Sequence, residues 1–267
     1  MIDLLLYYLQ LLLWILGVPA LLGLAVRLCA ATFGRLSGAS SGRVFDLTAV
    51  LGTPVHELGH AVMCPLFGHK VTKMCLWSPR HTDGRYGFVE HSYNKKNPWA
   101  RIGSIFIGFG PLFSGLGVIV LALWLCFPTL WDGYLAETRA LTTDAGLDVG
   151  RITQAILSLL TALPRAFVAD PLRSTLGLLL MLSVSLHVSL SAQDVKEALR
   201  ALPLFLLLTA VAALLTWVAR WSAPILAWFY LANVRLASLF ALVLAFSLLW
   251  VALALLWRFL KLFVSWF

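Results

Sequence analysis

Three ionisable residues lie close together in an apolar stretch, GTPVHELGHAVMC, at positions 52 to 64. His56 and His60 are four residues apart, so on a helix they lie about 40° apart around the axis and one turn apart along it. Two imidazoles in that arrangement can bind one zinc ion. Glu57 follows the first histidine, where its carboxylate can reach a water molecule on the metal. The spacing therefore predicts a zinc site on a helix.

The same three residues predict a reaction. Zinc lowers the pKa of a water molecule towards about 7, and a carboxylate beside it can accept the proton and pass it to a leaving amine. This is the HExxH chemistry of zinc peptidases. The alternative is two hydrogen-bonded core histidines with a salt-bridged Glu57, but each ionisable group in an apolar span costs about 2 to 3 kcal/mol or more. We expect Zn²⁺ bound by His56 and His60, Glu57 as general base, and no organic cofactor.

A catalytic zinc needs a third protein ligand. His187 and Asp194, in the later stretch SLHVSLSAQD, are the candidates at a suitable depth. Seven residues separate them by about 10 Å along a helix, so both can bind one zinc only if the helix breaks. Depth in the membrane favours His187 as the third ligand. Unwinding of SLSAQD would favour Asp194. The alternatives are a helix N-cap for Asp194, before VKEALRAL, and a supporting hydrogen bond for His187.

The composition places these residues in a membrane protein. Of 267 residues, 61% are hydrophobic and 12% are charged, and the mean hydropathy is +0.90. The net charge of +8 comes from residues clustered at the ends of apolar runs, which indicates membrane anchoring and no nucleic-acid partner. The four cysteines are widely spaced and predict neither disulfides nor a cysteine metal site.

Apolar runs of about the length of a bilayer predict an all-α polytopic membrane protein with about six transmembrane helices. The expected spans are about 4–29, with a kink at Pro19, then 45–68, 101–127, 174–193, 203–219 and 237–257. We expect a Gly/Ser loop, RLSGASSGR, after the first span and an interfacial segment, WSAPILAWFYLANVR, before the last. The small residues of GFGPLFSGLG predict close approach of helix backbones.

Two sections lie outside these spans. Residues 69 to 100 alternate in polarity around the turn signal HTDG, which predicts a small interfacial β-hairpin between helices two and three. Residues 128 to 173 predict an extramembrane section with an amphipathic helix at ITQAILSLLTAL. The expected organisation is an N-terminal helix and loop at 1–44, a catalytic core at 45–200 and C-terminal helices at 201–267.

Lysine and arginine residues set the expected orientation. Residues 69 to 101 carry seven of them, and they share one side of the membrane with the N-terminus. Because short basic loops stay in the cytoplasm, we expect this side to be cytoplasmic. The prediction is a multi-pass protein of an inner or plasma membrane, with its active site towards the cytoplasm.

Together these stretches resemble the site-2 protease family of intramembrane zinc metalloproteases. The resemblance is carried by HELGH in an apolar helix, the GRYGFVEHSY section, NPWARIGSIFIGFGPLFSGLG, and a later helix that ends in an aspartate, over about residues 45–125 and 176–200. It implies that His56 and His60 are ligands and that Glu57 is the base. It implies Asp194 as third ligand, through unwinding of its helix, although the asparagine, proline and glycine of the family's motif are absent here.

The resemblance also implies that residues 84 to 93 present an extended substrate, with Gly110 and Pro111 structural. The expected function is an intramembrane zinc metalloendopeptidase that cuts membrane-embedded or membrane-proximal segments of a protein substrate. A non-proteolytic zinc-binding membrane chaperone or sensor is the alternative, and a metal transporter is a weaker one because no internal repeat is visible. Metal binding alone does not require Glu57, so its presence favours the enzyme. The sequence makes no prediction of oligomeric state.

Overall fold

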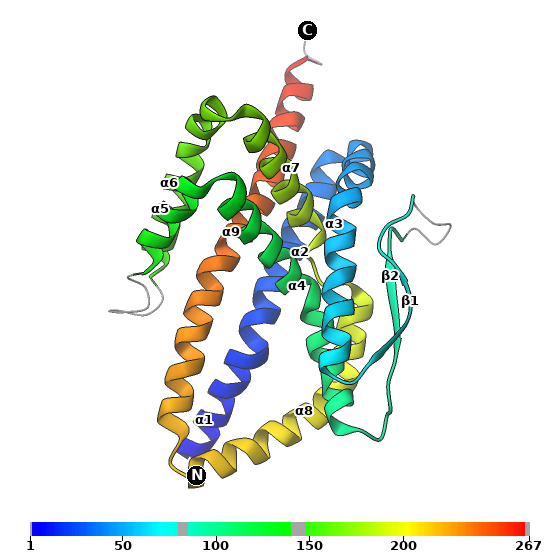
Figure 1. Cartoon of the computed structure of the whole chain (residues 1–267), viewed down its shortest axis with the longest axis vertical. Helices are drawn as coiled ribbons and strands as arrows, with labels where there is room; N and C mark the ends of the chain where they lie inside the picture. The colour runs from blue at the N-terminus through cyan, green and yellow to red at the C-terminus, as the bar shows by residue number, and fades with distance from the viewer. Residues whose placement is uncertain (1, 80–84, 140–147, 265–267) are drawn as a thin grey trace.

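The structure, a computed structural model, describes residues 2–79, 85–139 and 148–264 (Figure 1). Most of these residues are helical. Five stretches among them are long and apolar enough to cross a membrane: Ile2–Ser37, Pro98–Cys126, Val149–Ala169, Ala192–Val218 and Ser222–Leu262. The predicted all-α, multi-pass membrane architecture with a small hairpin is thus confirmed, although the helices at the predicted spans 45–68 and 174–193 are not among these five.

The chain begins with one long helical stretch. Helix α1 (Ile2–Leu12) and helix α2 (Val18–Ser37) are joined by a π-helical turn, η1 (Leu13–Gly17). The turn ends just before Pro19, whose missing N–H removes one hydrogen bond of a regular α-helix. Helix α3 (Ala39–Leu66) follows after a single residue, Gly38, with a φ of +56°. The predicted loop RLSGASSGR is therefore wrong, because one glycine in a left-handed conformation reverses the chain.

The hairpin lies alongside α3, as the strands in Figure 1 show. Strand β1 (Lys70–Cys75) pairs antiparallel with β2 (Phe88–Ser92), with a bulge between Val71 and Lys73. The predicted HTDG turn falls outside the described residues. Helix α4 (Pro98–Cys126) begins where the Asn97 side chain accepts a hydrogen bond from the Trp99 N–H, with proline in the first turn.

The second half differs from the predictions at several helix ends. Helix α5 (Pro128–Arg139) precedes α6 (Val149–Ala169), which is long and apolar enough to be a span although the sequence predicted an extramembrane section. Helix α7 (Pro171–His187) ends six residues before the predicted 193. Helix α8 (Ala192–Val218) starts eleven residues before the predicted 203, because Ser191 caps it. The charged residues of its first turns lower the local hydropathy, so the span was predicted to begin only at residue 203.

The last helix, α9 (Ser222–Val264), is continuous over 43 residues. It contains all of WSAPILAWFYLANVR except Trp221, so the predicted separate interfacial segment is wrong. At 1.5 Å per residue the helix is about 65 Å long, about twice the hydrocarbon thickness of a bilayer. It packs beside α2 over much of this length.

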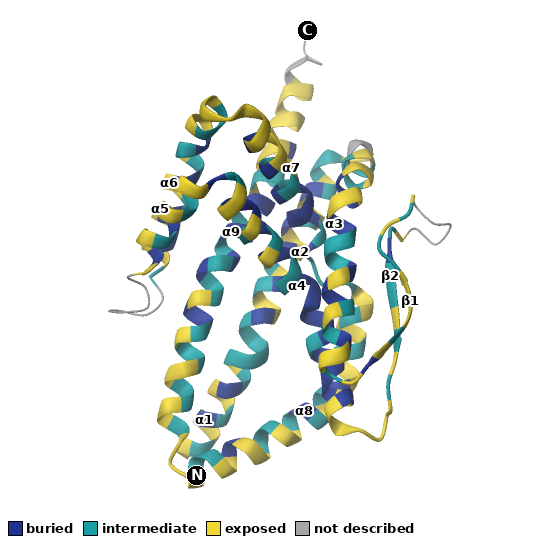
Figure 2. Ribbon diagram, in the orientation of Figure 1, coloured by how far each residue is buried: buried dark blue, intermediate teal, exposed yellow. Residues whose placement is uncertain are grey.

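Helix α4 forms the middle of the molecule, packed against α3, α7 and α8. Its residues are mostly buried, whereas the outer helices show exposed faces (Figure 2). Many exposed side chains on those faces are large and apolar, as at Leu28, Val62 and Leu207. Such a surface is expected where lipid, not water, surrounds a protein. The polar residues of HELGH face α4 and the ends of α7 and α8.

Candidate metal centre

HELGH lies within α3, and its glycine sets how closely α3 meets α4. A Cβ atom added to Gly59 would lie 2.6 Å from the Gly110 carbonyl oxygen, and one added to Gly110 would lie 2.3 Å from the Gly59 carbonyl oxygen. The two backbones are therefore in direct contact here. The close approach predicted from GFGPLFSGLG is confirmed, and it brings the α4 main chain within reach of His60.

Each histidine of the motif donates a hydrogen bond to a main-chain carbonyl. Nδ1 of His60 lies 2.9 Å from the Ile107 oxygen, and Nδ1 of His56 lies 2.7 Å from the His187 oxygen. Both carbonyls lack a regular helical partner: Pro111, four residues after Ile107, has no N–H, and His187 is the last residue of α7. Pro111 and the end of α7 thus leave these two carbonyl oxygens available to accept hydrogen bonds from the histidines.

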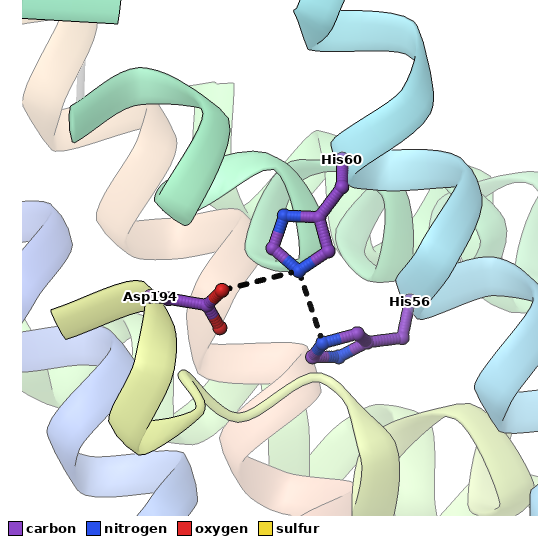
Figure 3. A group of neighbouring side chains, drawn as sticks. All are labelled: His56, His60 and Asp194. Carbon is purple, nitrogen blue, oxygen red and sulfur yellow. Dashed lines mark hydrogen bonds and ion pairs between the residues drawn. The ribbon is translucent and has the colours of Figure 1, made fainter. Parts of the chain in front are cut away.

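These hydrogen bonds fix the protonation of the histidines. A carbonyl can only accept, so each ring carries its proton on Nδ1 and, when neutral, leaves a lone pair on Nε2. The two Nε2 atoms lie 3.3 Å apart, and Nε2 of His60 lies 3.4 Å from Oδ1 of Asp194. Figure 3 shows the three side chains converging from α3 and α8. Electron-rich atoms this close repel one another unless a cation or a proton lies between them.

The two separations measured from His60 Nε2 fit a tetrahedral zinc ion. Ligand atoms at about 2.0 to 2.2 Å from zinc lie about 3.3 to 3.5 Å from one another, which matches the 3.3 and 3.4 Å measured here. All three candidate ligand atoms lie within 4.8 Å of one another. The donor set of two imidazoles and one carboxylate is also one that zinc uses in catalytic sites. These residues could therefore hold a zinc ion.

Asp194 reaches this group because the chain is not helical between α7 and α8. Residues 188–191 form a short connection, and Asp194 lies in the first turn of α8. Its Oδ2 accepts a hydrogen bond from the Ser191 N–H at 2.8 Å, while the Ser191 hydroxyl accepts one from the Asp194 N–H at 3.1 Å. Asp194 is thus part of a capping box, close to the predicted alternative role, and still directs Oδ1 at His60.

The side chain of His187 lies elsewhere. Its Nε2 donates to the Thr48 hydroxyl at 3.0 Å, and its ring packs so tightly on α3 that a Cβ on Gly52 would lie 2.5 Å from it. Its carbonyl oxygen, not its imidazole, meets His56. Of the two candidates for a third ligand, the structure brings Asp194 to the histidine pair and leaves the His187 ring outside it.

Glu57 lies on the wall of a cavity that opens onto the three side chains. The residue is buried, with 8% of its surface exposed. The cavity has a volume of about 630 Å³, and its lining includes parts of α2, α3, α4, α8, the end of α7 and strand β2. A volume of this size is large enough to admit water and part of a peptide chain beside the histidines.

Arg27 of α2 also lines this cavity, and sequence reasoning gave it no role beyond orientation. Its guanidinium donates a hydrogen bond to the Leu190 carbonyl oxygen at 3.1 Å. The signal was present in the sequence, because Arg27 is the only charged residue between Asp3 and Arg35 in an apolar run.

A second polar cluster lies at the edge of the cavity. His69 Nε2 donates to the Ala100 carbonyl at 2.7 Å, and the Nδ1 atoms of His69 and His91 are hydrogen-bonded at 3.0 Å. His91 Nε2 lies 3.8 Å from a carboxylate oxygen of Glu197. Burial, and secondly the neighbouring His69, lower the pKa of His91, against the opposing effect of Glu197. This cluster connects strand β2 to α8.

Comparison of the chain with protein-family models, with curated proteins and with solved structures returns no match. The resemblance to site-2 proteases therefore remains a prediction from the motifs, and the function is argued from the site itself.

Proposed function

We propose that the protein is an intramembrane zinc metalloendopeptidase that hydrolyses peptide bonds in membrane-embedded or membrane-proximal segments of other proteins. The observation that carries the proposal is the arrangement of three ligand atoms, with His60 Nε2 at zinc-like separations from the other two, next to a buried glutamate on the wall of a cavity. Both histidines are already oriented by carbonyl groups, as metal-binding histidines usually are.

The residues have distinct roles in this reaction. Nε2 of His56, Nε2 of His60 and Oδ1 of Asp194 hold the metal. A bound zinc ion would acidify a water molecule and polarise the carbonyl group of the substrate. Glu57 is adjacent to His56 in the helix and faces the same cavity. Its carboxylate accepts the proton of the water molecule as the oxygen attacks the carbonyl carbon, and then donates that proton to the leaving amine.

Strand β2 supports an extended peptide as the substrate. It pairs with β1 in a two-stranded sheet, so its other edge is not used by that sheet. Residues 85–89 and His91 line the cavity. A peptide that adds to this edge as a strand would present its backbone, and not its side chains alone, to the metal site. The basic residues around the hairpin support a cytoplasmic position for this side of the cavity.

Substitution of Glu57 tests the proposal. The variant Glu57→Gln keeps the size of the side chain and all three ligands, so we expect it to bind zinc as the parent does. Because it lacks the base, cleavage of a co-expressed membrane-protein substrate should fall by about 10² to 10⁴-fold. Zinc content of the purified protein and the amount of cleaved substrate are the two measurements.

Glu137→Gln is the matched control. Glu137 is an exposed residue of α5 that does not line the cavity, and its loss should change neither measurement. If Glu57→Gln cleaves as well as the parent, the proposal is wrong. A parent that binds zinc and cleaves no membrane protein would instead support the non-proteolytic chaperone or sensor.

A further inference from the structure

Arg27 is a charged residue in a helix that is otherwise suited to lipid. It lies within the candidate span Ile2–Ser37. Charged side chains within membrane spans are rare and usually mark a functional site. Arg27 faces the cavity that holds His56, His60 and Asp194, yet it is not one of the candidate ligands. Its contacts indicate what it does there.

The guanidinium of Arg27 binds the short non-helical connection between α7 and α8. Its Nη1 donates to the Leu190 carbonyl oxygen at 3.1 Å. One helical turn earlier in α2, the backbone at Gly23 packs against the Leu190 side chain, since a Cβ on Gly23 would lie 2.9 Å from Leu190 Cδ1. Helix α2 therefore holds both the main chain and the side chain of Leu190.

The other end of the same connection is held from α3. The His187 carbonyl accepts the Nδ1 hydrogen of His56 at 2.7 Å. Beyond Leu190, Ser191 and Asp194 form the capping box that begins α8. The connection is thus fixed at His187 by a candidate ligand and at Leu190 by Arg27, and Asp194 follows within one turn of the second fixed point.

We propose that Arg27 is a positioning residue for Asp194: by holding the Leu190 carbonyl, it sets the distance between the Asp194 carboxylate and the two histidines. This inference rests on the proposed function, because it assigns Asp194 as a metal ligand. The carbonyls of a non-helical connection lack regular helical partners, and a donor from a neighbouring helix stabilises such a connection. Without that donor, the first turn of α8 is free to move away from His60.

The test compares three substitutions in the purified full-length protein. Arg27→Met removes the donor and keeps a long side chain, whereas Arg27→Lys keeps a charged donor. Arg35→Met is the matched control, because Arg35 lies in the last turn of the same helix and does not line the cavity. Zn²⁺ affinity is measured by competition with a chromophoric chelator, and the absorption spectrum of bound Co²⁺ reports the ligand geometry.

We expect Arg27→Met to weaken Zn²⁺ binding by about 10 to 100-fold, the usual effect of removing a group that orients a ligand. Its Co²⁺ spectrum should shift towards that of Asp194→Ala. Arg27→Lys and Arg35→Met should resemble the parent in both measurements. Parent-like Zn²⁺ affinity in Arg27→Met would overturn the inference, and so would equal weakening in Arg27→Met and Arg27→Lys.

Hydrogen exchange separates this inference from the proposed function. If the parent binds no Zn²⁺, the proposed function fails. The role of the Arg27 hydrogen bond to Leu190 in holding this connection is still tested by amide exchange of residues 188–195 in the metal-free protein. Faster exchange there in Arg27→Met than in Arg27→Lys supports the conclusion that Arg27 holds this segment in place. Equal exchange in the two variants overturns it.

Discussion

At the scale of single residues, Asp194 and His187 contribute to the site through different atoms. Asp194 contributes a carboxylate oxygen, 3.4 Å from Nε2 of His60. His187 contributes its main-chain oxygen, which accepts from His56. Every residue has a main-chain carbonyl, so substitution of the His187 side chain leaves that acceptor in place. The two residues should therefore respond very differently to mutation.

Metal content of purified variants checks this difference. Asp194→Ala should lose at least about tenfold in Zn²⁺ affinity, because a ligand contributes no less than the groups that orient it. His187→Ala should bind Zn²⁺ nearly as the parent does. Asp194→Asn is the control for the helix cap, since its amide oxygen can still accept from the Ser191 N–H. We expect it to lose metal and keep its folding. Loss of metal in His187→Ala, with retention in Asp194→Ala, would reverse the assignment.

At the scale of elements, the site depends on the contact between α3 and α4. The His60 ring reaches the Ile107 carbonyl because the two backbones touch at Gly59 and Gly110. The acceptor is available because Pro111 interrupts the hydrogen bonds of α4. Gly59 allows α3 to pack directly against α4. Pro111 leaves the Ile107 carbonyl oxygen available to accept the hydrogen bond from His60.

Gly59→Ala should therefore force α3 and α4 apart. We expect the free energy of unfolding to fall by about 1 to 3 kcal/mol, the usual cost of overpacking. Thermal unfolding in detergent measures the change. Gly117→Ala, on α4, is the control. Apart from the neighbouring residues and backbone of its own helix, no heavy atom of the described structure would lie within 4 Å of the added Cβ. If both substitutions have the same effect, the proposed importance of the contact is wrong.

At the scale of the whole molecule, a metal ion would join α3 to α8. Their ligands come from residues more than a hundred positions apart in the chain, and exposed apolar side chains cover much of the outer surface around them. A ligand that binds the folded state alone stabilises it, by about 2.7 kcal/mol when present at a hundred times its dissociation constant. The metal should thus contribute to stability as well as to chemistry.

Chelation of the metal tests this contribution. A metal-free sample should unfold at a lower temperature than the same sample resupplied with Zn²⁺, because the folded state loses the stabilisation by binding. A variant in which both His56 and His60 are alanine should unfold at the same temperature with and without Zn²⁺. A parent protein whose unfolding temperature is independent of Zn²⁺ would contradict the expectation.

The sequence alone determined the features that depend on neighbouring residues. The apolar composition predicts a helical membrane protein because the bilayer leaves few other options for the backbone. The four-residue spacing of His56 and His60 places both on one face of a helix wherever that helix lies. The alternation around residues 69 to 100 predicted the hairpin for the same local reason. Each of these predictions needs only the geometry of one element.

Other features were decided by tertiary structure. The hydrogen bonds that the connection between α7 and α8 receives from His56 and Arg27 join residues as far as 163 positions apart. The sequence left both His187 and Asp194 open, because depth in a span does not say which side chain turns towards α3. The packing of α2, α3 and α4 around the connection determines this. Hydrogen bonds from His56 and Arg27 hold its carbonyls in place, and this brings the Asp194 carboxylate to the histidines.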